Sequence, residues 1–251
     1  MKKINKSDPP NPLTQFAEQF PQGNWNDFRN FNQSQSYLQT RQRLIDDQQG
    51  LCGFCEKNIS KLGDHHQRIE HFHSKSDLEG QHNWALDWFN IFAVCTGGSR
   101  WSPQESNKNY LRPQDLSCDA YKDRQIRTNE LPIACEGHLL NPLTIATSPN
   151  LFKLNKANGH LEPHNENCKV WLATDNNYQT TQQLVAATIK HLNLNCRRLA
   201  DVRLKILKQY NQQVKKYRLV NDKQGLVKLA NHWLSAKSPE FYTTKRCLLG
   251  K

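Results

Sequence analysis

Four cysteines between Cys52 and Cys118 constrain this chain more than any other feature of its sequence. Cys52 and Cys55 form a Cys-x2-Cys pair, whereas Cys95 and Cys118 are separated by 22 residues. Two residues between thiolates allow both sulfurs to reach one tetrahedral ion. A lone Cys-x2-Cys pair also suits redox chemistry or two buried thiols, but no thioredoxin-like βαβ pattern surrounds this one. The spacing therefore favours a structural zinc ion bound by the four thiolates.

Polar residues of another kind are interleaved with these cysteines. Glu70 and His71 are adjacent, Asn90 begins the apolar run that ends at the third cysteine, and Asp119 directly follows the fourth. Phosphodiester hydrolysis needs a base to activate water and a cation to carry charge on the phosphate. Histidine suits the base because its unperturbed pKa lies near neutrality, and carboxylate oxygens suit Mg²⁺ or Mn²⁺. A solvated acid beside a surface histidine would explain an isolated Glu-His pair, but not the whole ordered set.

Composition favours a polyanionic partner. The chain of 251 residues carries a formal charge of +11, and clustered cations release counterions when they bind phosphates; a basic protein kept soluble by its charge is the alternative. It has no apolar run of about 18 residues and no apolar segment after Met-Lys-Lys-Ile-Asn-Lys, so we expect no membrane span and no signal peptide. We therefore expect a cytoplasmic protein, in which eight cysteines favour metal binding over disulfides.

The helical and turn patterns divide the chain into three segments. Residues 1–50 are predicted to be an N-terminal helical segment, residues 51–137 a zinc-bound core, and residues 138–251 a hairpin and helical region packed as one unit with the core. Apolar periodicity and turn residues predict a helix that opens near Cys118, a hairpin around Asn158-Gly159, and helices at Leu13–Phe20, Tyr37–Gln49, Thr181–Leu194, Arg197–Arg218 and Leu226–Ala236.

The ordered set of residues resembles the HNH nuclease superfamily. In that superfamily a ββα-metal motif joins an acid–histidine pair, an asparagine and a metal ligand on the following helix, often within a four-cysteine zinc frame. The segments CGFCE, RIEHFHSKS, WFNIFAVC and SCDAYK, and later LNPL, GHLEP and IKHLNLN, are similar to the PtuB group of HNH proteins. The resemblance implies an α+β fold that is predominantly helical, with a zinc-bound ββα-metal core and a C-terminal helical region.

The resemblance also implies a role for each matching residue. His71 would be the general base, Asn90 would fix the loop around it, and Lys122 would face the phosphate backbone. Glu70 and Asp119 would bind a catalytic Mg²⁺ or Mn²⁺. The structural zinc would be held by Cys52, Cys55, Cys95 and Cys118. Two positions depart from the pattern: Asp119 stands where the superfamily often has His or Asn, and Ser74 where the group commonly has Pro.

Three further features have open alternatives. His73 is a third ligand, an alternative base, or a ring that merely stacks beside His71. Arg68 and Lys75 are phosphate contacts or ordinary surface charges. A dense basic set in the C-terminal region either binds substrate or partner or forms a solvated face; it comprises Arg197, Arg198, Arg203, Lys205, Lys208, Lys215, Lys216 and Arg218.

The leading interpretation is a metal-dependent endonuclease that acts on DNA or RNA. The PtuB resemblance implies a role in Septu or retron-associated anti-phage defence, with a PtuA-like ABC-type ATPase and a retron reverse transcriptase–msDNA complex as partners. A zinc-bound nucleic-acid-binding or adaptor module without catalysis is the main rival, but it would not need Glu70, His71, Asn90 and Asp119 together. A zinc deaminase is set aside because no Pro precedes Cys52 and no His-x-Glu stands at the site.

Overall fold

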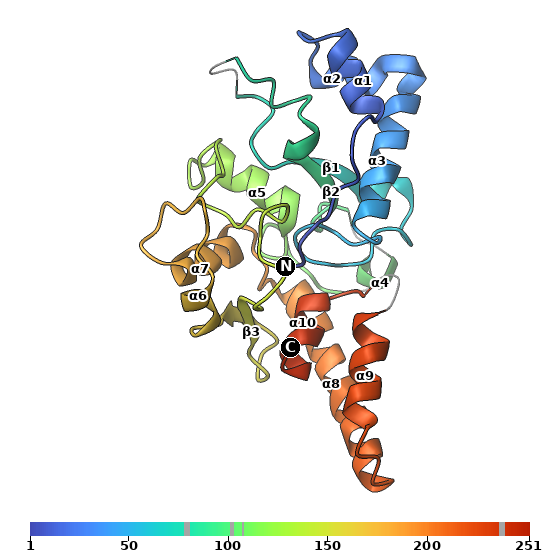
Figure 1. The fold of residues 1–251 in the computed structure, drawn as a ribbon, viewed down its shortest axis with the longest axis vertical. Helices are drawn as coiled ribbons and strands as arrows, with labels where there is room; N and C mark the ends of the chain where they lie inside the picture. The colour runs from blue at the N-terminus through green and yellow to red at the C-terminus, as the bar shows by residue number, and fades with distance from the viewer. Residues whose placement is uncertain (78–80, 101–102, 107, 236–238) are drawn as a thin grey trace.

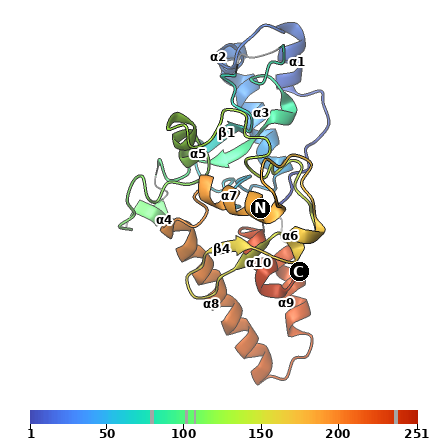
Figure 2. The same cartoon turned by 90° about the vertical axis from the view of Figure 1, so that its left-hand side faces the viewer.

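Helices surround two small antiparallel sheets in the computed structural model, which describes residues 1–77, 81–100, 103–106, 108–235 and 239–251. The N-terminal helices α1–α3 occupy one end of the long axis, and α8 and α9 project as a hairpin from the other (Figures 1 and 2). The helices are α1 Pro12–Gln19, α2 Trp25–Asn30, α3 Gln35–Asp47, α4 Pro103–Ser106, α5 Cys118–Arg127, α6 Asn167–Val170, α7 Thr181–His191, α8 Arg197–Leu219, α9 Gly225–Leu234 and α10 Tyr242–Leu249. The strands are β1 Gln67–His71, β2 Ile91–Cys95, β3 Phe152–Leu154 and β4 Leu161–Pro163, and short 3₁₀ turns lie at Phe31–Ser34, Asp64–His66 and Trp88–Asn90.

Strands β1 and β2 pair antiparallel, and α5 is the next long helix along the chain. The register sets Gln67 opposite Cys95 and His71 opposite Ile91. Every residue of β2 is buried, as expected for a short apolar strand covered on both faces. The Gln48 side chain, just after α3, bonds to both the N–H and the carbonyl of Ala93, at 2.6 and 2.7 Å. The N-terminal helices are thereby joined to this sheet, and the order β1–β2–α5 is a ββα arrangement.

The start of α5 is fixed by a close backbone approach. The Ser117 N–H donates to the Gly97 carbonyl at 2.8 Å, and a Cβ on Gly97 would lie 2.0 Å from the Ser117 carbonyl oxygen. Gly97 also has a φ of +59°, which favours glycine. Cys118 itself adopts a φ of 54°, uncommon for a residue with a Cβ. These restraints place the Cys118 thiol beside the end of β2.

The loop that carries Cys52 and Cys55 is also bound to the C-terminal helix. Glu56 is buried and accepts hydrogen bonds from the N–H and the hydroxyl of Thr243, at 2.8 and 2.5 Å. The Phe241 N–H donates to the Glu56 carbonyl. One continuous hydrophobic cluster includes residues from Met1 to Leu248, so the three sequence segments share a core. No helix among the described residues has the length and apolar character needed to cross a membrane.

Each of the six predicted helices has a counterpart, including α5 for the helix expected near Cys118, and four helices of the described residues, α2, α4, α6 and α10, were not anticipated. The helices predicted at 13–20, 37–49, 181–194 and 197–218 correspond to α1, α3, α7 and α8, and the hairpin to β3–β4. Helix α9 runs to Leu234, and its predicted last residue, Ala236, lies outside the described residues. Helix α10 was not predicted, and neither was α2, although Asn24 and Asp27 form a capping box at its start.

Two members of the predicted basic set are not on the surface. Arg198 and Arg203 of α8 are only 2% and 1% exposed. Both side chains, including their charged ends, therefore lie in the interior. Arg198 and Arg203 are removed from the basic set proposed to bind substrate or partner. The six remaining cations of that set are exposed.

We predict that Glu56→Ala destabilises the fold by about 3 kcal/mol, because two buried donors of Thr243 lose their acceptor. The free energy of unfolding in urea measures this change. Glu166→Ala, which removes an exposed carboxylate, should have an effect within about 0.5 kcal/mol. An equal effect of the two substitutions would contradict the structural role assigned to Glu56.

Candidate zinc centre and active-site pocket

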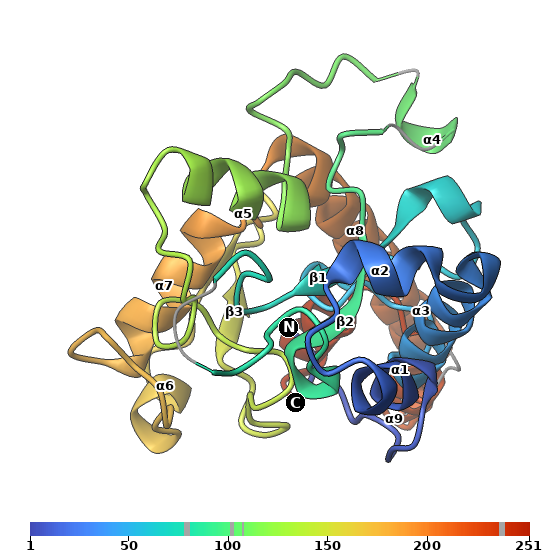
Figure 3. The same cartoon turned by 90° about the horizontal axis from the view of Figure 1, so that it is seen from above.

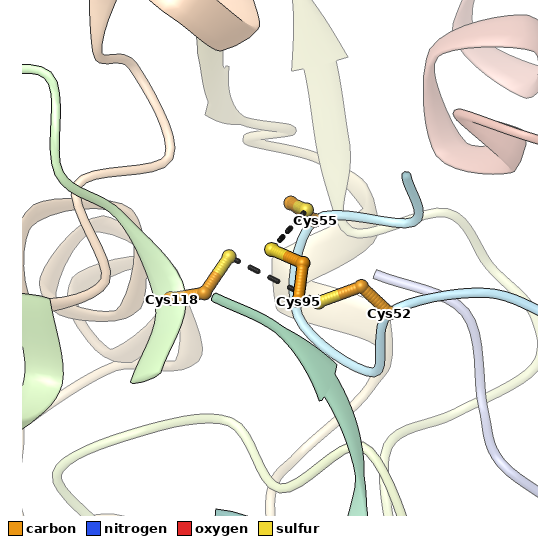
Figure 4. Close-up of side chains that lie close together, drawn as sticks. All are labelled: Cys52, Cys55, Cys95 and Cys118. Atoms are coloured by element: carbon orange, nitrogen blue, oxygen red, sulfur yellow. Dashed lines mark hydrogen bonds between the residues drawn. The ribbon is translucent and has the colours of Figure 1, made fainter. Parts of the chain in front are cut away.

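The four predicted zinc ligands converge in the structure (Figure 4). They come from the loop after α3, the end of β2 and the start of α5, and their sulfur atoms all lie within 4.8 Å of one another. The Cys55–Cys95 and Cys52–Cys118 sulfur distances are 3.7 and 4.0 Å. A tetrahedral ion with Zn–S bonds of about 2.3 Å has sulfurs about 3.8 Å apart, whereas a disulfide needs about 2.05 Å. The donor set and its spacing therefore fit a structural zinc ion.

Buried guanidinium groups of α8 lie near this cluster. Arg198 donates to Glu105 at 2.9 Å and to the Ser117 hydroxyl at 2.5 Å. Burial alone would lower the pKa of Arg198, but the thiols of Cys196 and Cys95 and the Glu105 carboxylate raise it. Four thiolates around Zn²⁺ carry a net charge of about −2. The buried cation would compensate part of that charge, and its ion pair with Glu105 also offsets the cost of its burial.

A pocket of about 350 Å³ contains most of the other predicted site residues, but neither Asn90 nor His73 lines it. Seen from the α1–α3 end of the molecule, β1 lies between α5 and α2 (Figure 3), and all three elements contribute to the pocket. Its lining comprises Trp25, Asn26, Arg29, Tyr37, Arg68, Ile69, Glu70, His71, Ser74, Lys75, Asp119, Lys122, Asp123 and Ile126. The structure thus brings Glu70, His71 and Asp119 together in one concave site.

Glu70 is held by Lys122 deep in the pocket wall. The Lys122 ammonium donates to Glu70 Oε1 at 2.6 Å and to the carbonyls of His71 and Phe72 at 2.7 and 3.0 Å. Burial alone would lower the pKa of Lys122, but the adjacent carboxylate outweighs it and the pKa is raised. Lys122 is 1% exposed, so it is not placed to face a phosphate backbone as the resemblance implied. Its three acceptors instead make it the residue that positions Glu70.

Asp119 lies next to Glu70 and forms an ion pair with Arg68. The Arg68 guanidinium donates to Asp119 Oδ2 at 2.7 Å and to the Ser99 hydroxyl at 3.1 Å. Burial raises the pKa of Glu70, Lys122 opposes this effect, and the nearby Asp119 carboxylate adds to it. Two neighbouring carboxylates with hard oxygen donors fit a divalent ion such as Mg²⁺ or Mn²⁺. Arg68 is therefore engaged with a predicted metal ligand rather than directed only at solvent.

His71 is oriented by a backbone carbonyl and an indole ring. Its Nε2 lies 3.1 Å from the Ala85 carbonyl oxygen, which can only accept a hydrogen bond; Nε2 therefore carries the proton and Nδ1 the lone pair. The Trp25 ring meets the imidazole edge-on, with centroids 4.4 Å apart. Burial lowers the pKa of His71 to about 3 against the opposing effect of the Ala85 hydrogen bond. The imidazole is consequently neutral near neutral pH.

Asn90 holds the segment that follows β1. Its carbonyl oxygen accepts from the His73 N–H at 2.8 Å, and its amide donates to the carbonyls of His73 and Trp84 at 3.0 and 2.8 Å. The His73 ring stacks on Trp84 with centroids 3.9 Å apart, and its nitrogens lie 2.6 Å from Asp77 and 3.0 Å from Glu136. His73 is not among the residues that line the pocket. Its surroundings favour a structural role.

Several lining residues were not anticipated from the sequence. Asp123 stands four residues after Asp119 on the same face of α5, a spacing that could have predicted it. Trp25, Arg29 and Tyr37 come from the N-terminal segment, which shows no motif of its own. Only the fold reveals that this segment forms one wall of the pocket. Lys75, which was predicted, also lies in the lining and is exposed.

We predict that Cys118→Ser lowers the zinc content of the purified protein and its thermal unfolding temperature, because a hydroxyl is a poor replacement for a zinc thiolate. Metal analysis and calorimetry on the same sample measure both. Cys247→Ser, at a cysteine outside the cluster, serves as the matched control and should retain the zinc. Equal zinc content in the two variants would contradict the assigned ligand set.

Comparisons with known proteins show the family of the chain. No family model matches the chain. The chain is 34% identical, over 251 residues, to an Escherichia coli protein named "Retron Ec83 putative HNH endonuclease", and the match covers 99% of this chain and 93% of that protein. Identity at this level over nearly the full length of both proteins indicates common descent. The chain belongs to the HNH endonuclease family.

Proposed function

We propose that this protein is a metal-dependent endonuclease that hydrolyses phosphodiester bonds of nucleic acid in the pocket between α2, β1 and α5. The observation that carries the proposal is the meeting of a neutral, oriented imidazole with two adjacent carboxylates in one pocket. A binding or adaptor module would need the zinc centre and the positive charge but not this combination. The family relationship supports the same reaction class.

His71 is the proposed general base. With Nε2 bonded to the Ala85 carbonyl, Nδ1 accepts the proton of the attacking water. A base with a pKa of about 3 is fully in its acceptor form at neutral pH, although its intrinsic basicity is low. A phosphate anion bound beside the imidazole favours the protonated form, which raises that basicity when substrate is present. Trp25 and the Ala85 carbonyl keep the ring in one orientation throughout.

Glu70 and Asp119 are the proposed ligands of the catalytic divalent ion. When bound, Mg²⁺ or Mn²⁺ would offset charge on the scissile phosphate and on the leaving oxygen. Lys122 fixes Glu70 through a buried ion pair, and Arg68 contacts one oxygen of Asp119. Each of these ion pairs engages one carboxylate oxygen, so the second oxygen of each residue is a candidate ligand atom. Asn90 restrains the segment between β1 and β2 through backbone bonds.

We expect His71→Ala to lower the cleavage rate of labelled DNA or RNA by about 10²–10⁴-fold, because general-base catalysis contributes that much. Zinc content and the circular dichroism spectrum should not change. His232→Ala, at an exposed histidine of α9, should cleave at the wild-type rate. Cleavage by His71→Ala at the wild-type rate would show that the base is wrongly assigned. Wild-type protein that binds nucleic acid without cleaving it would favour the alternative, an adaptor module without catalysis.

Glu70→Gln and Asp119→Asn should each weaken Mn²⁺ binding in calorimetric titrations while leaving the zinc content unchanged. Each substitution removes a negative charge and one strong oxygen donor from the proposed site. Asp64→Asn, at an exposed carboxylate outside the pocket, is the control and should bind Mn²⁺ as the wild type does. Unchanged Mn²⁺ affinity in both pocket variants would refute these ligands.

We further propose that the protein acts as an effector of a retron-linked anti-phage system, with a reverse transcriptase–msDNA complex and a PtuA-like ABC-type ATPase as partners. The name of the relative supports the retron link. The hairpin of α8 and α9 supports a docking role, because Leu219 and Val220 at its tip are 78% and 66% exposed beside the exposed Arg218. Loss of co-purification after Leu219→Asp and Val220→Asp, with cleavage by the isolated chain unchanged, would test this assignment.

A further inference from the structure

The cations of the pocket fall into two classes. Lys122 and Arg68 are paired with Glu70 and Asp119 at 2.6 and 2.7 Å. Arg29 and Lys75 also line the pocket, and neither has an ion pair within the described part of the chain. Both are exposed. A phosphate that enters this pocket therefore meets two exposed cations that form no ion pair, although the charge of Lys75 also acts on the Asp123 carboxylate, whereas Lys122 and Arg68 are each paired with a carboxylate.

Arg29 is held in place by an aromatic ring. Its guanidinium carbon lies 5.4 Å from the centroid of the Tyr37 ring, within the range of a cation–π contact. A cation–π contact does not use the N–H donors of the guanidinium group as hydrogen-bond donors to another side chain, so they are available for a phosphate. An arginine on an open surface would lose more side-chain entropy on binding, because nothing would restrict its rotamers beforehand.

The helix that carries Arg29 is tied to the proposed base. Asn24 caps α2 through the N–H groups of Asn26 and Asp27. Trp25, at the first position of α2, packs against Tyr37 and edge-on against His71, with centroid distances of 6.0 and 4.4 Å. The position of Arg29 relative to the imidazole is thus set by a chain of ring contacts. An ordinary exposed arginine of a basic protein would not be linked to the proposed base by ring contacts of this kind.

We propose that Arg29 is a substrate-binding residue that contacts a backbone phosphate next to the scissile one, with Lys75 as a second contact across the pocket. This inference rests on the proposed function, and it assigns a substrate contact to the N-terminal segment, outside the stretch from Cys52 to Lys122 that carries the HNH motif. Phosphate contacts position a strand without reading its bases. Arg29 therefore contributes affinity that is independent of sequence.

Binding without added divalent ions tests the proposal, because it separates affinity from cleavage. The dissociation constants of the wild type and Arg29→Ala are measured for two labelled nucleic acids of unrelated sequence, between 50 and 200 mM salt. We expect roughly tenfold weaker binding at the lowest salt. The slope of log K against log salt should become shallower by about 0.9 for a duplex or about 0.7 for a single strand. The loss of affinity should be equal for the two nucleic-acid sequences.

Two further variants distinguish a phosphate contact from a structural effect. Arg29→Lys keeps the charge and should restore the salt slope while recovering only part of the affinity, because an ammonium lacks the planar donor set. Lys156→Ala removes an exposed cation in the turn between β3 and β4, outside the pocket, and should change neither quantity. Unfolding temperatures of all variants should match, since the substituted side chains are exposed.

The outcomes separate this inference from the function on which it rests. If the wild type binds and Arg29→Ala binds with the same affinity and the same salt slope, the Arg29 assignment is overturned while the proposed nuclease stands. If Lys156→Ala is as defective as Arg29→Ala, the effect is one of net charge, and the assignment is again overturned. If the wild type binds no nucleic acid under any salt condition, both the proposed function and the Arg29 contact are refuted.

Discussion

The convergence of four thiols from three separate parts of the chain is the constraint on which this structure depends. The loop after α3, the end of β2 and the start of α5 are short elements joined by backbone hydrogen bonds and a shared apolar core. One tetrahedral ion bound to all of them would fix their mutual positions within a few tenths of an ångström. The same three regions carry or adjoin β1 and α5, which present the pocket residues. A structural metal bound here would thereby influence the geometry of a chemically different site.

Electrostatic pairing explains how the pocket tolerates its buried charges. Two carboxylates this close would repel each other in a poorly solvated site. Lys122 and Arg68 contact one carboxylate each, so the pocket remains close to neutral and its acids stay oriented. A residue that the family resemblance assigned to the substrate is thus part of the internal support of the site. Exposed cations on the rim, rather than buried ones, are the natural phosphate contacts.

The sequence predicted the centre of this molecule better than its periphery. Cysteine spacing and the acid–histidine pair identified residues that the fold brings together, because their chemistry restricts where they can lie. Amphipathic periodicity located α3, α7 and α8. It could not show that Arg198 and Arg203 are buried beside the cysteine cluster, because a buried and an exposed arginine look alike in a basic helix. Nor could it show that Trp25 and Arg29 reach the pocket, since that contact depends on how α2 packs against β1.

Anomalous diffraction from crystals of the His71→Ala variant grown with Mn²⁺ and a nucleic acid would test the central claim most directly. The account predicts a zinc signal at the centre of the four cysteine sulfurs. It predicts a separate manganese signal in contact with Glu70, Asp119 and a backbone phosphate. Manganese bound elsewhere, or a phosphate backbone that bypasses the pocket between α2 and α5, would contradict it.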